Sequence, residues 1–168
     1  LQPKTPENTK LAKRWFALAA AGEHPNAQFA LGYIEEASGN GRAAFNWYKL
    51  AKAGGSRPAV FNLGRCYENG FGVAQSSKLA GEHYRLAAIS GHPESQYALG
   101  LLIYNEAKTE VGFREAYMWW SLAASRFPMA TGEREAAGGE RDALARRMTA
   151  AELAEARRLA RVWETRHL

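Results

Sequence analysis

Two sets of residues recur along this chain at a nearly constant spacing. The first set is aromatic and precedes alanine-rich segments, with intervals of 32, 36 and 36 residues between Phe16, Tyr48, Tyr84 and Trp120. The second set consists of leucine–glycine pairs whose glycine stands six or seven residues after a proline: Leu31-Gly32, Leu63-Gly64 and Leu99-Gly100. Two such series in a fixed phase indicate an internal repeat, which constrains the fold more than any other feature.

Each repeat contains two segments with a helical spacing of apolar residues. In the second repeat, segment 58–69 begins at a proline suited to the first turn of a helix and ends at Asn69-Gly70, where the chain can become left-handed. Segment 76–89 is capped by Ser76 or Ser77. A helix pair of this length buries its apolar face only against a neighbouring pair. With abundant alanine and few β-branched residues, the pattern predicts an all-α chain, a right-handed superhelix of stacked antiparallel helix hairpins (an α-solenoid).

The stretch Gly70-Phe71-Gly72 has two interpretations, a phosphate-binding loop or a turn between helices. A phosphate-binding glycine loop follows a β-strand and opens a helix. This stretch follows a helical segment and falls where each repeat must turn, so we interpret its glycines as structural. The glycines of the leucine–glycine pairs lie in the middle of helical segments, where glycine costs about 1 kcal/mol relative to alanine. Their recurrence predicts a close approach of the backbone between paired helices.

These residues resemble the Sel1-like repeat (SLR) family, a relative of the tetratricopeptide repeats. The family pattern runs A-x-x-x-L-G-x-x-Y-x-x-G-x-G-V, then a spacer, then W-Y-x-x-A-A-x-x-G. The second repeat carries the first half in full: Ala59, Leu63, Gly64, Tyr67, Gly70, Gly72 and Val73. The first repeat has Glu35 and the third has Ile103 in place of the tyrosine, and 105-NEAKTEV-111 replaces the glycine turn. The resemblance favours a bacterial protein of a kind that is often exported.

The repeats divide one predicted domain, residues 1–168, into consecutive segments. These are 5–22, the second helix of a partial repeat; 25–55, 58–91 and 93–127, the three repeats; and 131–168, a C-terminal pair of capping helices. The partial repeat leads us to expect further sequence upstream. Thr149 and Glu152 have the spacing of a capping box at the start of the last helix. Met148, Leu153 and Trp163 are expected to cover the apolar face of the last repeat.

No pattern for catalysis, a cofactor or a metal stands out, so we predict a non-enzymatic protein with no cofactor. The four histidines have no metal-ligand spacing, and no G-x-S-x-G motif occurs. Cys66 is the only cysteine, and we expect a buried, inert thiol because no base is placed beside it by spacing. Glu35, Glu36 and Glu68 are interpreted as carboxylates on polar faces. General acid–base catalysis by a pair of carboxylates stays open, but nothing in the sequence requires it.

The net charge of +5 results from 22 basic and 17 acidic residues. The C-terminal pair is rich in arginine but also carries several carboxylates, so we predict a salt-bridged helix surface and no nucleic-acid partner. No apolar run is long enough to span a bilayer, so we expect no direct membrane insertion of this segment. The resemblance favours a periplasmic or secreted protein, while a cytoplasmic location stays open. We expect a monomer.

We predict that the protein is a scaffold or adaptor. It would bind a peptide or protein domain on the concave surface lined by the first helix of each repeat. The alternatives are a repeat domain of a larger exported or membrane-anchored regulator and, more weakly, a cell-wall-related hydrolase. The predicted binding residues are Tyr33, Asn62, Arg65, Asn69, Leu101 and Asn105. In this hypothesis Arg65 pairs with a ligand carboxylate and the asparagines hold the ligand backbone. The competing interpretation is that these side chains are simply solvated.

Overall fold

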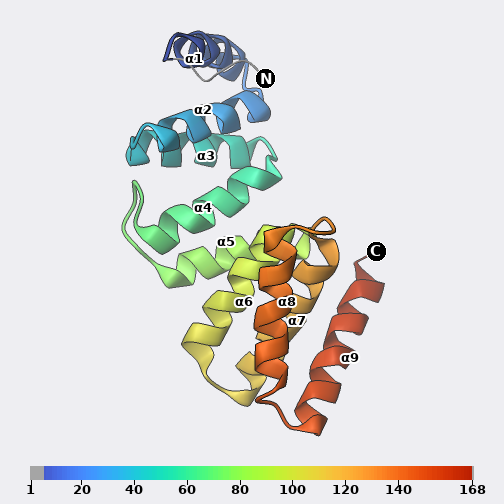
Figure 1. The fold of residues 1–168 in the computed structure, drawn as a ribbon. Coiled ribbons are helices and arrows are strands. Elements are labelled where there is room, and N and C mark those ends of the chain that lie inside the picture. Colours follow the sequence, from blue (N-terminus) through green and yellow to red (C-terminus); the bar gives the residue numbers. More distant parts are fainter. Residues whose placement is uncertain (1–5, 168) are drawn as a thin grey trace. The chain divides into compact units, whose positions relative to one another are not determined.

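The computed structural model describes residues 6–167, and these form nine α-helices without a β-strand (Figure 1). The helices are α1 Pro6–Ala21, α2 Pro25–Ala37, α3 Gly41–Ala53, α4 Arg57–Asn69, α5 Ser77–Ile89, α6 Pro93–Ala107, α7 Glu110–Arg126, α8 Gly132–Ala145 and α9 Ala150–Arg166. The prediction of an all-α chain is confirmed. Contacts divide the helices into two compact units, the first ending at His83 and the second beginning at Tyr84. The predicted domain boundaries stay a prediction.

In the first unit, α2 pairs with α3, α1 contacts α2, and α3 contacts α4. Pro25 begins α2 and Pro58 lies in the first turn of α4, as predicted, because the missing amide of proline costs nothing there. Helix α4 ends at Gly70, whose φ of 66° is left-handed. Ser76 caps α5, since its Oγ accepts a hydrogen bond from the Leu79 amide at 3.3 Å. The core of the unit consists of Ala44, Phe45, Tyr48, Ala51, Ala59, Leu63 and Cys66.

The glycine of the first leucine–glycine pair meets an aromatic ring of the partner helix. A Cβ atom built on Gly32 of α2 would lie 2.5 Å from Cε1 of Tyr48 on α3. The second unit repeats this arrangement, because a Cβ on Gly100 of α6 would lie 2.5 Å from Nε1 of Trp120 on α7. The predicted close approach is therefore present, but the group that contacts the helix backbone is a ring and not the neighbouring backbone. Glycine and aromatic positions thus pack together in these two hairpins.

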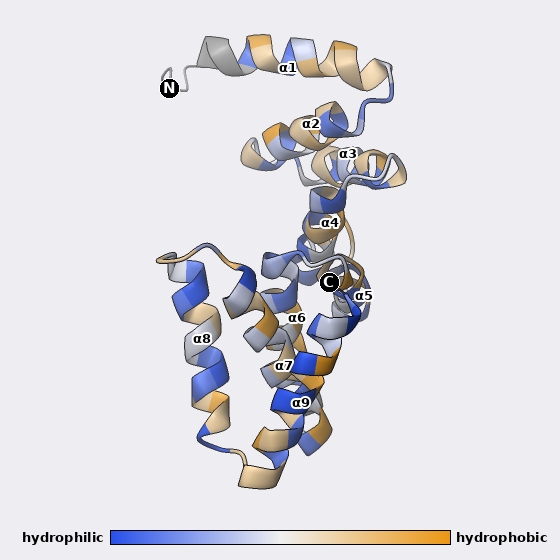
Figure 2. Ribbon diagram, turned by 90° about the vertical axis from the view of Figure 1, so that its right-hand side faces the viewer, coloured by the Kyte–Doolittle hydropathy of each residue, from blue (hydrophilic) through white to orange (hydrophobic). Residues whose placement is uncertain are grey.

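In the second unit, α6 pairs with α7, and α7 also contacts α8 and α9. Leu144 of α8 and Ala156 of α9 are buried together with Ala116, Tyr117 and Trp120 of α7. Met148 and Leu153 pack against the same cluster, and the Trp163 ring meets the Trp119 ring edge-on at 5.6 Å. The capping box of Thr149 and Glu152 is present at the start of α9. Stretches of α8 and α9 outside these contacts are hydrophilic (Figure 2).

The aromatic series is buried at three of its four positions. Tyr48, Tyr84 and Trp120 are each at most 1% exposed, whereas Phe16 of α1 is 37% exposed. Trp15, in the position of the buried Trp119, is 65% exposed. The physical reason is that α1 contacts α2 on one side, and within residues 6–167 no helix precedes it to cover the other side.

Candidate functional site

Four of the predicted binding residues lie in the first unit, on the first helices of two repeats. Tyr33 of α2 is 55% exposed, and Arg65 and Asn69 of α4 are exposed as well. Asn62 is the exception because its side chain is buried, with 7% exposure. The spacing of the α4 residues, at i, i+3 and i+7, places them along one face of the helix.

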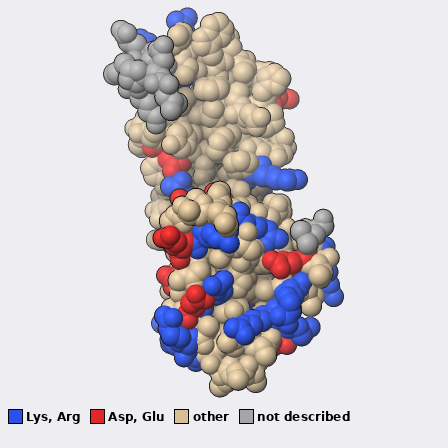
Figure 3. All heavy atoms as spheres, turned by 45° about the vertical axis from the view of Figure 1, so that its right-hand side comes forward, with Lys and Arg blue, Asp and Glu red and all other residues tan. Residues whose placement is uncertain are grey.

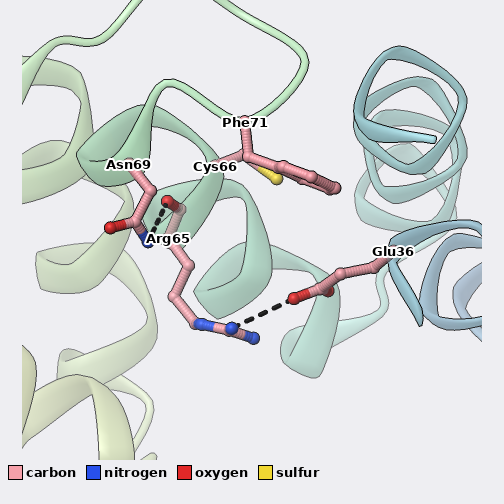
Figure 4. Close-up of a pocket in the computed structure, with 5 residues that line it drawn as sticks. All are labelled: Glu36, Arg65, Cys66, Asn69 and Phe71. Atoms are coloured by element: carbon pink, nitrogen blue, oxygen red, sulfur yellow. Dashed lines mark hydrogen bonds and ion pairs between the residues drawn. The ribbon is translucent and has the colours of Figure 1, made fainter. Parts of the chain in front are cut away.

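Arg65 contacts residues of both α2 and α4, and Figure 4 shows its contacts with Glu36 and Asn69. Its Nη2 lies 3.0 Å from Oε1 of Glu36 on α2, and its Nη1 donates to Oδ1 of Asn62 at 3.5 Å. Asn69 donates from Nδ2 to the Arg65 carbonyl oxygen at 3.1 Å. The amide oxygen of Asn62 thus faces the guanidinium of Arg65 rather than solvent. The Arg65 side chain keeps 44% of its surface exposed.

Glu36 joins three helices at this point, which the sequence interpretation of a carboxylate on a polar face did not foresee. Besides Arg65 of α4, it accepts a hydrogen bond at 2.5 Å from the hydroxyl of Tyr48 on α3. Burial, and then the neighbouring Glu36 carboxylate, raise the pKa of Tyr48, so this hydroxyl stays a donor. A signal was present in the sequence: Glu36 stands four residues after Gly32 and so shares the helix face that meets Tyr48.

Glu36, Arg65 and Asn69 line a pocket of about 280 Å³ between α2 and α4, together with Cys66 and Phe71. Phe71 follows the left-handed Gly70, and its amide bonds to the Cys66 carbonyl at 2.8 Å, so the helix-ending turn brings the ring to the wall of the pocket. Figure 4 shows the guanidinium of Arg65 joined to the carboxylate of Glu36 by an ion pair at this pocket. The pocket therefore offers a cation, a carboxylate, an amide and an apolar ring within one hollow.

The pocket does not have the chemistry of a nucleophilic site. Burial, followed by the nearby Glu36 carboxylate, raises the pKa of Cys66 to about 11. The thiol is therefore protonated at neutral pH, and a protonated thiol is a poor nucleophile. As for metals, residues 6–167 contain no group of three or more His, Cys, Asp or Glu side chains arranged to hold an ion.

Glu35 differs from its predicted place on a polar face. It is buried, with 6% exposure, and its carboxylate lies 2.5 Å from Nζ of Lys13 on α1 and accepts from Nδ2 of Asn40 at 2.7 Å. These two hydrogen bonds lower the pKa of Glu35. Because Glu35 occupies the position of the tyrosine in the repeat pattern, a buried carboxylate paired with the partly exposed Lys13 replaces a ring at this packing site. Its role is to join α1 to α2.

The two remaining predicted residues, Leu101 and Asn105, lie on α6 in the second unit. Leu101 is partly buried against the cluster that contains Trp120 and Leu144. Asn105 is exposed near the end of the helix. Leu101 thus contributes to packing, while Asn105 is accessible for contacts. Whether these two residues bind a ligand stays a prediction.

The arginine-rich helices α8 and α9 carry both signs of charge. Nε of Arg141 lies 2.7 Å from Oδ1 of Asp142, and Arg158 pairs with Glu155 at 2.7 Å. Figure 3 shows Lys and Arg side chains beside Asp and Glu side chains on this part of the protein. Interspersed charges of this kind support the interpretation of a salt-bridged helix surface over a continuous phosphate track.

Four consecutive segments of the chain match the Sel1 repeat, residues 2–24, 25–56, 57–92 and 93–126. The chain belongs to the Sel1 repeat family. Sel1 repeats generally serve as protein–protein interaction modules. The helices α8 and α9 follow the last matched repeat.

Two solved structures resemble the Sel1 repeat chain. One is the crystal structure of a protective antigen present in uropathogenic Escherichia coli strains and displaying an SLR fold, with a TM-score of 0.83, 25% identity, and coverage of 98% of this chain and 34% of that one. The other is a Sel1 repeat protein from Oxalobacter formigenes, with a TM-score of 0.60, 28% identity, and coverage of 71% and 54%. The α-solenoid prediction is confirmed by these likenesses.

The chain spans about a third of the length of the E. coli protein and about half of the length of the O. formigenes protein. Within residues 6–167, no helix combines the length and apolar character that crossing a membrane requires.

Proposed function

We propose that this Sel1 repeat chain binds a peptide segment of a partner protein at the pocket between α2 and α4. The observation that carries the proposal is Arg65, a half-exposed cation held in place by Glu36 and Asn62 at the edge of a 280 Å³ hollow. A guanidinium that is already oriented loses little side-chain entropy on binding, so it recognises an acceptor more strongly than a free arginine would.

The other groups of the pocket suit a peptide ligand. A carboxylate or carbonyl of the ligand would accept from the free N–H groups of Arg65, and the exposed amide of Asn69 would bond to the ligand backbone. Phe71 offers an apolar surface. Tyr33, which lies on α2 as Glu36 does, is an exposed aromatic residue of the kind enriched in protein interfaces. Asn62 would act indirectly by fixing the position of Arg65.

The proposal is tested by selecting peptides from a displayed random library against the immobilised domain and measuring their affinity for variants. Arg65→Gln should weaken binding about tenfold or more, because a hydrogen bond to a charged group is lost. Tyr33→Ala should also weaken binding. The matched control is Arg57→Gln, an exposed arginine at the start of α4 that does not line the pocket. Equal affinities of Arg65→Gln and Arg57→Gln, with unchanged melting temperatures, would refute the proposal.

A further inference from the structure

The second unit contains another hollow, of about 480 Å³, between α7 and α8. Small residues and charged residues line it together. Ser121, Ala124 and Ser125 of α7 face Arg134, Gly138 and Arg141 of α8 across it. None of these residues belongs to the pocket between α2 and α4, so the two sites are independent.

Gly138 is unexplained by the packing of the chain. It lies with Gly139 in the interior of α8, where glycine is the least favourable residue apart from proline. A Cβ on Gly138 would meet only Nη2 of Arg141, at 3.9 Å, and a Cβ on Gly139 would have no atom of the described residues within 4 Å. Gly32 and Gly100, by contrast, are required by the rings that contact them. Gly138 lines the hollow and has no side chain, so the backbone of α8 is accessible there.

The two arginines that line the hollow are anchored and still have donors to offer. Nη1 of Arg134 donates to the Phe127 carbonyl at 3.1 Å, and Nε of Arg141 contacts Asp142 at 2.7 Å. A guanidinium has five N–H groups, so most donors of each remain for a ligand. Arg134 also lies in the first turn of α8, where the helix dipole disfavours a cation. Local helix stability therefore does not account for its position.

The serines of α7 indicate which groups the ligand carries besides one that accepts hydrogen bonds from the arginines. Ser121 Oγ donates to the Tyr117 carbonyl and Ser125 Oγ to the Leu122 carbonyl, both at 2.8 Å. With its proton used in this way, each hydroxyl faces a ligand as an acceptor. Glu135 also lines the hollow, and Glu164 lies 3.5 Å from Ser125 Oγ. These acceptors disfavour a simple anion and favour a ligand that carries N–H donors beside a carboxylate.

We infer that the hollow between α7 and α8 binds an acidic peptide segment. Arg134 and Arg141 receive an Asp or Glu carboxylate, Ser121 and Ser125 accept from the peptide amides, and Gly138 lets the peptide backbone approach α8. The occupant is thus a second stretch of a protein partner, recognised by negative charge together with main-chain donors.

The test uses the ¹⁵N-labelled chain titrated with acetyl-Gly-Glu-Gly-Glu-Gly-amide up to about 10 mM, a range suited to weak peptide binding. Amide signals of Gly138 and Ser125 should shift with the glutamate peptide. The corresponding glutamine peptide should bind about tenfold more weakly, as should the glutamate peptide to the double variant Arg134→Gln, Arg141→Gln. Shifts of equal size with the glutamine peptide, or no shifts at all, would overturn the inference, as would equal shifts with inorganic phosphate.

Two alanine variants separate binding from stability. Gly138→Ala and Gly139→Ala should each raise the melting temperature by about 2–4 °C because alanine favours the helix. Only Gly138→Ala should weaken binding of the glutamate peptide, about fivefold, since its methyl group would stand in the hollow between the peptide and α8. Gly139→Ala should bind the peptide as the parent chain does. Equal affinity of the two variants would contradict the assigned role of Gly138.

Discussion

The ring of Tyr48 lies against the backbone of α2 at Gly32, so closely that a methyl group at Gly32 would stand 2.5 Å from the ring. The hydroxyl of the same ring bonds to Glu36 one turn further along α2, and Glu36 in turn holds Arg65. One packing contact of the hairpin thus determines the position of the charged groups at the pocket. Tyr48 thus connects the packing of the α2–α3 hairpin to Glu36 and Arg65 at the pocket.

The first prediction concerns this contact. Gly32→Ala should lower the free energy of unfolding by about 1–3 kcal/mol, even though alanine favours a helix by about 1 kcal/mol. The Tyr48 ring is fully buried and its hydroxyl is fixed by Glu36, so it cannot move aside without loss. Urea unfolding measures the effect. Gly139→Ala is the control and should be stabilising; a stabilising Gly32→Ala would show that the contact is not tight.

The second prediction concerns the dependence of stability on pH. The pKa of Glu35 is lowered by its hydrogen bonds to Lys13 and Asn40, so the ion pair stabilises the fold above the unfolded pKa of about 4.3. This contribution is lost as the pH falls through the lower pKa of the folded state. Glu35→Gln should cost on the order of 1 kcal/mol at pH 7, since Lys13 is partly exposed.

Urea unfolding of both proteins at pH 7 and near pH 2.5 measures this difference. The gap between the parent chain and Glu35→Gln should narrow at the lower pH, because Glu35 takes up a proton as the pH falls through its lowered pKa in the folded state. The comparison between variants removes the contribution of the other carboxylates. A gap that is the same at both values would mean that the ion pair does not stabilise the junction of α1 and α2.

The third prediction concerns Cys66. Its thiol is buried and its pKa is raised to about 11, so a thiol reagent at pH 8 should react with the folded chain far more slowly than with the chain in urea. Absorbance after addition of an aromatic disulfide reagent records both rates. Rapid reaction without denaturant would indicate that the wall of the pocket opens readily.

The fourth prediction concerns the C-terminal helices. Leu144→Ala should lower the free energy of unfolding by about 2–5 kcal/mol, because it leaves a cavity between α8 and the buried residues of α7. Tryptophan fluorescence during urea unfolding is a suitable probe, since Trp120 belongs to the same cluster. Arg146→Ala, a change at the exposed C-cap residue of α8, should alter stability little. Similar effects of the two substitutions would contradict the assigned packing of α8.

Much of the site could not be predicted from the sequence. Arg65 and Asn69 could be selected because helix periodicity places them on one face of α4. Asn62 follows the same periodicity, yet its burial depends on the neighbouring helix. Glu35 and Glu36 are adjacent acidic residues that the sequence pattern does not distinguish. Glu35 is buried and pairs with Lys13, whereas Glu36 connects Tyr48 to Arg65. Periodicity identifies the face of a helix, whereas the partner of a charged group depends on residues far away in sequence.

By itself the sequence determined the repeat, the helix pairs and their ends. These features depend on local chemistry: proline begins helices, a left-handed glycine ends them, and aromatic and glycine positions recur in phase. Only the tertiary structure decided that the glycines meet rings, that Trp15 is exposed, and that Arg65 is already held by Glu36. Burial and ion pairing are properties of the space between helices, and that space exists only after the hairpins have packed together.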